Sequence, residues 1–165
     1  MKLELNKVLE CVGEAEVVTA NVDLTQESYR GIFPFKEPIV LEARASNRAG
    51  VVTLNCTYTY TLHLTCDRCL TNITREVTQE ASHIVVRELN NTEDDDFLLA
   101  PSGIVELSEL AQGDIVLELP GKFLCKEDCK GLCPKCGQNL NHGSCGCDTR
   151  QLDPRFAALD RFYEE

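Results

Sequence analysis

The sequence contains no tryptophan and only one methionine, and aromatic residues make up 6% of its 165 residues. Large aromatic side chains therefore fill little of its core. Valine, isoleucine, threonine and tyrosine, which favour strands, are common instead. The length suits one domain with a small appended module, and the composition predicts that this domain is rich in β-structure.

Basic residues are scarce. Lysine and arginine number 16 against 27 aspartates and glutamates, which gives a net charge of -11. A protein that binds nucleic acid through its phosphates needs a basic patch, and none is visible in the sequence. The overall field repels RNA and attracts basic proteins. We therefore expect a basic protein as partner rather than naked nucleic acid, with direct contact to RNA left open.

The sequence also lacks long apolar runs. Residues 1–7 do not resemble a signal peptide, and no segment reaches the length needed to cross a membrane. We therefore expect a cytoplasmic protein whose thiols stay reduced. Its ten cysteines then indicate a bound metal. Zinc is expected, and an iron–sulfur cluster, a redox dithiol and disulfides are the alternatives.

Six of the cysteines lie within residues 125–147, among glycine, lysine and asparagine. A segment with so little apolar area cannot fold by burial, so a metal bound by thiolates is expected to hold it. Cys133-Pro-Lys-Cys136-Gly is a zinc-knuckle sequence, in which the glycine lets backbone amides turn toward the sulfurs. Cys145 and Cys147 can return to the same metal and complete a four-sulfur site.

The remaining cysteines predict a second four-sulfur site. Cys125 and Cys129 need two partners, and Cys66 and Cys69 are available far upstream. Two other arrangements stay open: an exchange that groups the upstream pair with the zinc-knuckle pair, and a single site beside free thiols. The predicted ligands of the two zinc ions are Cys66, Cys69, Cys125, Cys129, Cys133, Cys136, Cys145 and Cys147.

The strongest periodicity in the sequence spans residues 52–65. Apolar residues alternate with polar ones from Val52 to Leu64, as in a strand with one buried face. The run would extend roughly 40 Å, so a bend or bulge is expected within it. An alternating stretch over 73–86 follows. The two strands predict a β-hairpin with the pair Cys66–Cys69 at its tip.

Weaker patterns predict the other elements. The expected order is a short strand or helix over 1–13 with Asn6 as N-cap, a strand over 14–24, a connection over 25–37, a strand over 38–46, a turn over 47–50, an acidic loop over 87–103 and a helix over 104–120 that Pro120-Gly121 ends. Ile32, Phe33 and Phe35 are expected to enter the core from the connection. The apolar helix face comprises Leu107, Leu110, Ala111, Ile115, Val116 and Leu119.

Two segments have alternative interpretations. The charge run Glu93–Asp96 is a solvated loop or a docking surface for a basic partner. Residues 153–162 form a short amphipathic helix that docks on its own domain or in the groove of a partner. The predicted fold class is α+β: mainly an antiparallel sheet or partly open barrel, one or two helices and a small zinc-bound C-terminal segment. The expected domains are 1–120 and 121–165.

Catalytic patterns are missing from the sequence. It has no phosphate-binding glycine loop, no nucleophile elbow and no helical His-Glu-x-x-His. Sites with four sulfurs are closed and act structurally. Cys11 and Cys56 are expected to be buried as small apolar residues. His63 and His83 fall in strands, and His142 is an alternative zinc ligand. We therefore predict no enzymatic activity.

Four stretches carry a resemblance to a known family. They are Cys66-Asp-Arg-Cys-Leu, Leu117-Glu-Leu-Pro120, the segment 125–147 and Asp153-Pro-Arg-Phe-Ala-Ala-Leu159. The order of strands, cysteine pair, acidic loop, helix and tail resembles the YceD family of large ribosomal RNA accumulation proteins over nearly the whole chain. The likeness is greatest to Gram-positive members with the full C-terminal cysteine set.

This resemblance implies a bacterial, cytoplasmic and non-enzymatic factor whose loss reduces or misprocesses large-subunit ribosomal RNA. We therefore expect a zinc-binding factor in large-subunit biogenesis that acts through a ribosomal protein or a pre-large-subunit particle. The alternative is a chaperone or binding module for a basic ribosomal protein. A thiol-redox enzyme or a nuclease is less favoured, because the expected zinc sites are closed and no acid–base pair stands out.

Overall fold

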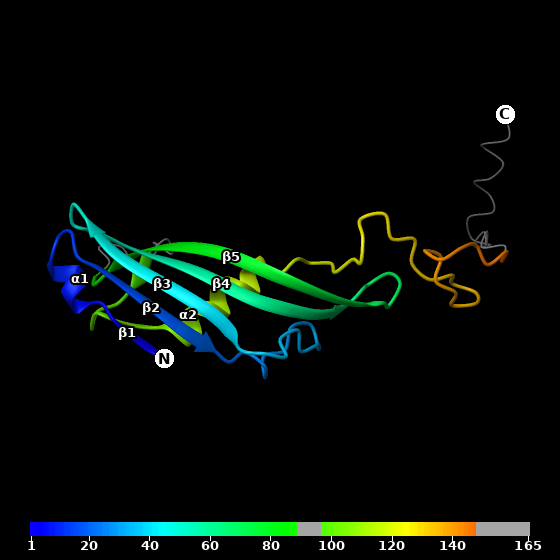
Figure 1. Ribbon diagram of the computed structural model, residues 1–165, viewed down its shortest axis with the longest axis horizontal. Coiled ribbons are helices and arrows are strands. Elements are labelled where there is room, and N and C mark those ends of the chain that lie inside the picture. The colour runs from blue at the N-terminus through cyan, green and yellow to red at the C-terminus, as the bar shows by residue number, and fades with distance from the viewer. Residues whose placement is uncertain (89–96, 148–165) are drawn as a thin grey trace, which may run out of the picture. The chain divides into compact units, whose positions relative to one another are not determined.

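The structure of the protein, a computed structural model, describes residues 1–88 and 97–147 (Figure 1). The chain forms two units. Residues 1–64 and 73–121 make the sheet unit, and residues 65–72 together with those from 122 onward make the cysteine unit. The predicted acidic run Glu93–Asp96 and the predicted helix over 153–162 lie outside the described residues. No helix in the described ranges has both the length and the apolar character to span a membrane.

A five-stranded sheet dominates the sheet unit and confirms the predicted α+β class (Figure 1). Its strands follow the order β2-β3-β4-β5-β6. β2 pairs antiparallel with β3, and β3 pairs antiparallel with β4, whereas the short β6 joins β5 in parallel. The strands are β2 (Ala15–Val22), β3 (Ile39–Arg48), β4 (Val51–Thr65), β5 (Asn72–Val86) and β6 (Phe97–Leu99).

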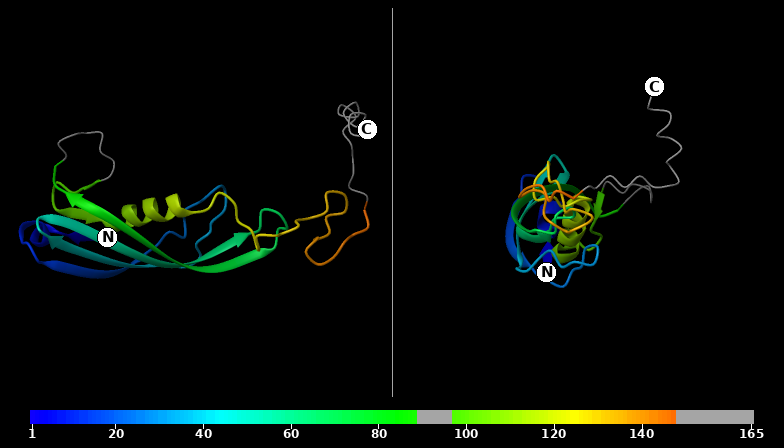
Figure 2. Two further views of the ribbon diagram at one scale, coloured as in Figure 1. Left: turned by 90° about the horizontal axis from the view of Figure 1, so that it is seen from above. Right: turned by 90° about the vertical axis from the view of Figure 1, so that its right-hand side faces the viewer.

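The alternating run predicted over 52–65 forms β4, the central strand of this sheet. Along β4 every second side chain is buried, with Leu54 and Tyr58 fully enclosed, because strand residues point alternately to the two faces. β3 repeats the pattern beside it. The strands curve along their length (Figure 2), as predicted from the length of the run. The pairing of β3 with β4 is unbroken from Val51 to Thr59, so the curvature in this part arises without a bulge.

The N-terminal residues form both of the predicted alternatives: β1 (Lys2–Glu4) and α1 (Asn6–Glu10). The prediction that Asn6 caps the helix is wrong, because Leu5 occupies the N-cap position. Leu5 is fully buried and fixes the start of the helix one residue earlier. The Asn6 side chain instead accepts a hydrogen bond of 3.3 Å from Arg87.

The connection after β2 buries one of the three aromatic or aliphatic residues expected there. Phe35 is enclosed and packs edge-on against Tyr60, with ring centroids 5.7 Å apart. Ile32 and Phe33 are exposed, so that part of the prediction is wrong. Both residues follow a tight turn in which Arg30 adopts a positive φ of 53° and which the pairing of Tyr29 with Ile32 closes.

The segment before the main helix contains two short strands that the sequence analysis missed. β6 lies where a loop was predicted, and β7 (Ile104–Glu106) lies where the helix was predicted to begin; β7 pairs with β1. The helix itself, α2 (Leu107–Glu118), ends just before Pro120 as expected. Its predicted inner face is confirmed at Leu107, Ala111, Ile115 and Leu119, but Leu110 is only half-buried and Val116 is exposed.

Asp114 links α2 to the sheet through polar contacts. Its carboxylate accepts a hydrogen bond of 2.5 Å from the Tyr58 hydroxyl and lies 2.9 Å from Nε2 of His83. Its backbone carbonyl accepts a hydrogen bond from the Gln79 amide group. Burial raises the pKa of Tyr58, and the hydrogen bond to Asp114 raises it further, so the tyrosine remains a donor. One helix residue thus fixes α2 against β4 and β5.

Candidate metal centre

The hairpin tip between β4 and β5 forms a tight loop around two sulfurs. The amide of Cys66 donates to the carbonyl of Thr71, and the amide of Leu70 donates back to the carbonyl of Cys66, each over 2.9 Å. Leu70 adopts a positive φ of 58°, which is unfavourable for a side chain of L configuration. This geometry turns Cys66 and Cys69 to the same side, as the spacing predicted.

A second loop repeats this pattern in the C-terminal segment. The amide of Cys133 donates to the carbonyl of Gln138 over 2.8 Å, and the amide of Gly137 donates to the carbonyl of Cys133 over 2.9 Å. Gly137 has a φ of 73°, the left-handed conformation that glycine adopts without strain. Glycine therefore does in this loop what Leu70 does at the hairpin tip.

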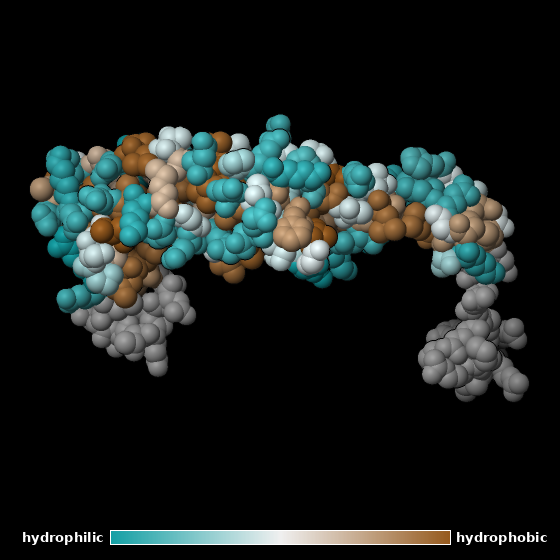
Figure 3. Space-filling view, turned by 90° about the horizontal axis from the view of Figure 1, so that it is seen from below, coloured by the Kyte–Doolittle hydropathy of each residue, from teal (hydrophilic) through white to brown (hydrophobic). Residues whose placement is uncertain are grey.

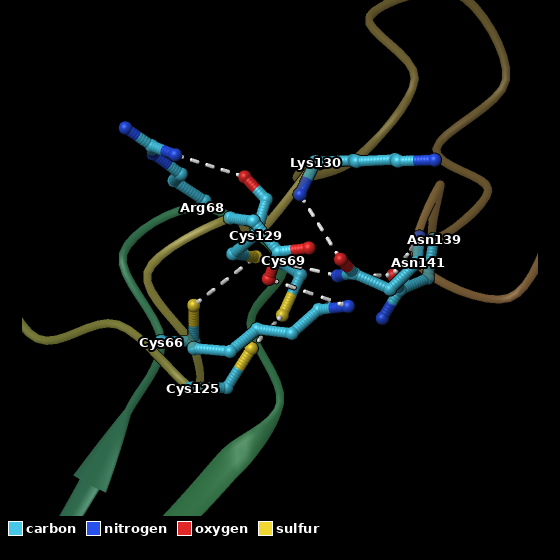
Figure 4. A network of polar contacts seen from close by, with 10 residues as sticks. Cys66, Arg68, Cys69, Cys125, Cys129, Lys130, Asn139 and Asn141 are labelled. Atoms are coloured by element: carbon cyan, nitrogen blue, oxygen red, sulfur yellow. Dashed lines mark hydrogen bonds and ion pairs between the residues drawn. The ribbon is translucent and has the colours of Figure 1, made fainter.

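The first group of sulfurs unites the hairpin tip with the start of the C-terminal segment. The Sγ atoms of Cys66, Cys69, Cys125 and Cys129 all lie within 4.8 Å of one another. Cys66 is 3.8 Å from Cys129, and Cys69 is 3.5 Å from Cys125 (Figure 4). Four thiolates around zinc at about 2.3 Å stand about 3.8 Å apart in a tetrahedron. The group therefore has the size of a four-sulfur metal site.

The second group is local. The Sγ atoms of Cys133, Cys136, Cys145 and Cys147 also lie within 4.8 Å of one another. The structure thus brings together the two sets that the spacing favoured, and it does not form the exchanged set. His142 belongs to neither group among the described residues. Both groups could hold metal ions.

Backbone contacts attach the C-terminal segment to the hairpin tip. The Arg68 guanidinium donates to the Cys129 carbonyl over 2.9 Å, and the Arg68 carbonyl accepts a hydrogen bond of 3.1 Å from the amide of Leu132. A Cβ on Gly131 would come within 3.0 Å of the Arg68 carbonyl oxygen, so the close approach depends on glycine. Sequence reasoning missed these residues, although a glycine two positions after a predicted ligand is a usable signal.

Asn141 connects the loop of the second group to a sulfur of the first (Figure 4). Its Nδ2 donates to Sγ of Cys129 over 3.3 Å, and its Oδ1 accepts a hydrogen bond of 3.0 Å from the amide of Lys130. The Asn139 side chain holds Asn141 in place by accepting from both its amide and its Nδ2. Amide donors to a thiolate offset its negative charge, so Asn141 supports the first group from outside.

The thiols of the first group have opposite proton affinities. Burial acts to raise the pKa of Cys66. Hydrogen bonds from the amides of Cys125, Cys69 and Arg68 outweigh burial and bring this pKa down to about 6. Burial and the neighbouring thiols raise the pKa of Cys125 to about 12. Without metal, Cys66 therefore loses its proton at lower pH than Cys125.

The second group has the same division. Hydrogen bonds from the amides of Cys136 and Lys135 lower the pKa of Cys133 to about 6. The Cys136 and Cys145 side chains raise the pKa of Cys147 to about 12. The sequence Cys133-Pro-Lys-Cys136-Gly predicted that backbone amides turn toward the sulfurs. The amides that hydrogen-bond to Cys133 agree with this prediction.

Metal binding to the metal-free protein is expected to release at least one proton from each group near pH 7. A ligand thiol whose pKa is about 12 is protonated there and must ionise to bind. Metal affinity therefore rises with pH. Calorimetric titration with zinc in two buffers of different ionisation enthalpy measures the protons released. Binding heats that are the same in both buffers contradict this prediction.

Replacing Asn141 with alanine is expected to weaken metal binding at the first group by about 10–100-fold, because such outer contacts fix and neutralise a ligand. Competition with a chelator of known affinity measures the change. Gln138→Ala is the control, since that exposed side chain lies in the same loop but makes no hydrogen bond to the residues that the structure describes. Equal affinities for the two variants contradict a role for Asn141.

The two remaining cysteines differ from each other. Cys56 is buried on the inner face of β4, as predicted, but Cys11 is exposed, so that prediction is wrong. Cys11 follows the last residue of α1, where the chain turns at the surface. None of the ten cysteines, all of which the structure describes, forms a disulfide.

Comparison with known proteins assigns the chain to a family. The model of the family described as large ribosomal RNA subunit accumulation protein YceD matches residues 54–163. Protein YlbN of Bacillus subtilis is 24% identical over 130 residues, which are 78% of this chain and 76% of that protein. No solved structure matches the chain.

Two further relatives align over shorter stretches. A chloroplast protein of Arabidopsis thaliana, named large ribosomal RNA subunit accumulation protein YCED homolog 1, is 31% identical over 61 residues, which are 37% of this chain and 19% of that protein. A protein of Mycobacterium tuberculosis is 31% identical over 103 residues, which are 57% of this chain and 47% of that protein. The family match includes all eight clustered cysteines, and the chain belongs to the YceD family.

Proposed function

We propose that the protein is a zinc-held, non-enzymatic factor in the biogenesis of the large ribosomal subunit. The observation that carries this proposal is the family match, whose description names large ribosomal RNA accumulation, over a segment that contains both four-cysteine groups. Zinc is the metal we propose, because tetrahedral sets of four thiolates select zinc or iron–sulfur clusters. A colourless purified protein with two zinc ions per chain would agree with zinc.

The proposed role of the metal is structural. A site with four protein sulfurs has no open position for water or substrate. Over its described residues, 65–72 and 122–147, the cysteine unit offers few buried apolar side chains beyond the cysteines, with Phe123 as one of them. Metal ligation is therefore proposed as the main source of its fold.

The proposed partner is a ribosomal protein or a pre-large-subunit particle. The net charge of -11 supports a basic protein as the group in direct contact, since phosphate binding requires the opposite charge. The same charge supports a second candidate function, a chaperone or binding module that keeps one basic ribosomal protein soluble before assembly.

Depletion of the protein in cells tests the first function. The expected result is a lower ratio of large-subunit to small-subunit ribosomal RNA, with the protein sedimenting beside incomplete large subunits in a gradient. An unchanged ratio, and a protein that stays at the top of the gradient, would contradict the assembly role. A complex with one ribosomal protein that survives nuclease treatment but never sediments with particles would favour the chaperone instead.

A further inference from the structure

A groove runs between helix α2 and the short strands β6 and β7. Its volume is about 480 Å³, and it lies within the sheet unit. Figure 3 shows hydrophobic side chains that reach the surface of the sheet unit among hydrophilic ones. The apolar residues that line the groove are Leu98, Leu99, Ile104, Val105, Leu110 and Leu117.

Several of these apolar side chains are largely exposed to solvent. Leu117 is 86% exposed and Leu99 is 48% exposed. Scattered exposed leucines are ordinary on protein surfaces, but apolar side chains that gather around one groove indicate a binding surface. On α2, Leu110 and Leu117 stand two turns apart on one face, and Gly113 lies between them.

Gly113 is the second observation. Glycine inside a helix costs about 0.5–1 kcal/mol relative to alanine. The sheet unit does not require it, because a Cβ at Gly113 would meet nothing within 4 Å. Because glycine has no side chain, nothing projects from the middle of this side of the groove, and an approaching helix can come close to the backbone of α2 there. A side chain of the approaching helix can then occupy the space that a Cβ at position 113 would fill.

The charge of the groove indicates the occupant. Three carboxylates line it, at Glu106, Glu109 and Asp114, and no lysine or arginine does. Asp114 binds Tyr58 and His83, and Glu106 pairs with the N-terminal ammonium of Met1. Glu109 is exposed and has no ion-pair partner among the described residues, so it is the carboxylate left for a partner. An apolar surface with an acidic rim complements a segment that is apolar on one side and basic beside it.

We propose that this groove binds a basic amphipathic helix of a protein partner, with an apolar side chain of that helix seated over Gly113 between Leu110 and Leu117. This inference rests on the proposed function for the class of partner, a basic ribosomal protein. Beyond that function, the inference identifies the groove as the surface that contacts the partner. The two described units thus have separate tasks: the sulfurs hold the cysteine unit, and the sheet unit carries the docking surface.

Binding of the full-length protein to an RNA-free mixture of large-subunit ribosomal proteins tests the proposal. Leu117→Glu and Gly113→Leu are each expected to reduce binding at least tenfold. Val116→Glu is the matched control, because Val116 is the neighbouring exposed residue of α2 but does not line the groove; binding within twofold of the parent is expected. Weaker binding by Leu117→Glu cannot be a charge effect, since added negative charge attracts a basic partner.

Gly113→Ala separates binding from folding. Alanine is expected to raise the melting temperature, because it favours the helix, and to weaken binding in the same protein. A photo-crosslinking residue at position 117 identifies the occupant. The expected product is a basic segment of one ribosomal protein. Melting curves of the Glu and Leu variants verify that each one folds.

The outcomes are distinguishable. If the parent protein binds a basic ribosomal protein and the groove variants bind it equally well, the groove proposal is overturned while the proposed function stands. If the parent protein binds no ribosomal protein, the proposed protein partner falls, and the groove proposal falls with it. A crosslink to a second copy, to residues 148–165 of the same chain or to an acidic segment overturns the proposed occupant.

Discussion

In the proposed protein with two zinc ions, replacing Cys66 with serine is expected to reduce bound metal from two ions to one and to unfold the part of the cysteine unit that the first group holds. Cys66 is fully buried among the four sulfurs, and a hydroxyl is a poor ligand for a metal that thiolates bind. Structural zinc supplies about 10–16 kcal/mol of apparent binding free energy in small zinc domains. Within residues 122–132 and the hairpin tip, few buried apolar side chains besides the cysteines are present to compensate for its loss.

Elemental analysis and limited proteolysis measure this result. New cleavage is expected within residues 122–132, while the core strands of the sheet unit stay protected. Cys11→Ser is the control, because Cys11 is exposed and lies in neither group; it should retain two ions and the parent cleavage pattern. Two ions in the Cys66 variant would show that this cysteine is not a ligand.

Replacing Asp114 with alanine is expected to lower the free energy of unfolding of the sheet unit by about 2–3 kcal/mol, since the change leaves a buried hydroxyl without its acceptor. The Tyr58 ring is fully enclosed, so water cannot easily take the place of the carboxylate. The same change removes the partner of His83. Urea unfolding followed by circular dichroism gives the difference.

A double-mutant cycle isolates the contact between Tyr58 and Asp114. Tyr58→Phe removes the hydroxyl, so Asp114→Ala should cost less in that background than in the parent protein. Glu109→Ala on the exposed side of the same helix is the control and should change stability by less than about 0.5 kcal/mol. Equal costs of the Asp114 change in both backgrounds would contradict coupling through this hydrogen bond.

The long strands were predictable because their burial follows a simple period. In β4 the alternation continues for the whole strand, and one face packs on the core. The strands β6 and β7 have three residues each, too few to show a period. Their partners, β5 and β1, lie elsewhere in the chain, so only the tertiary fold reveals them.

The candidate ligands were predictable from spacing, whereas the residues that support them were not. Pairs such as Cys133 and Cys136 are recognisable because a tight turn can present both sulfurs. The contact of Asn141 with Cys129 spans twelve residues and depends on how the intervening loop folds back. An asparagine in a polar loop has no sequence signal that separates this role from ordinary solvation.

Exposure was hardest to predict near turns. Cys11, Ile32 and Phe33 are apolar by residue type and were expected inside, but each is exposed. Cys11 follows the end of α1, and the other two follow the turn at Arg30. The direction of a side chain at a turn depends on the local φ and ψ angles, such as the positive φ of Arg30. Residue type alone does not contain that information.

The ligand order of the first group has a consequence for synthesis on the ribosome. The hairpin pair is translated first, and Cys125 follows Cys69 by 56 residues, which takes about 3–11 s at about 5–20 residues per second. The second group comes from residues 133–147 and can close as soon as those residues leave the exit tunnel. The hairpin thiols must therefore remain reduced and without their final ligands for several seconds. In each new chain, the first group cannot be completed until the whole sheet unit, which ends at residue 121, has been made.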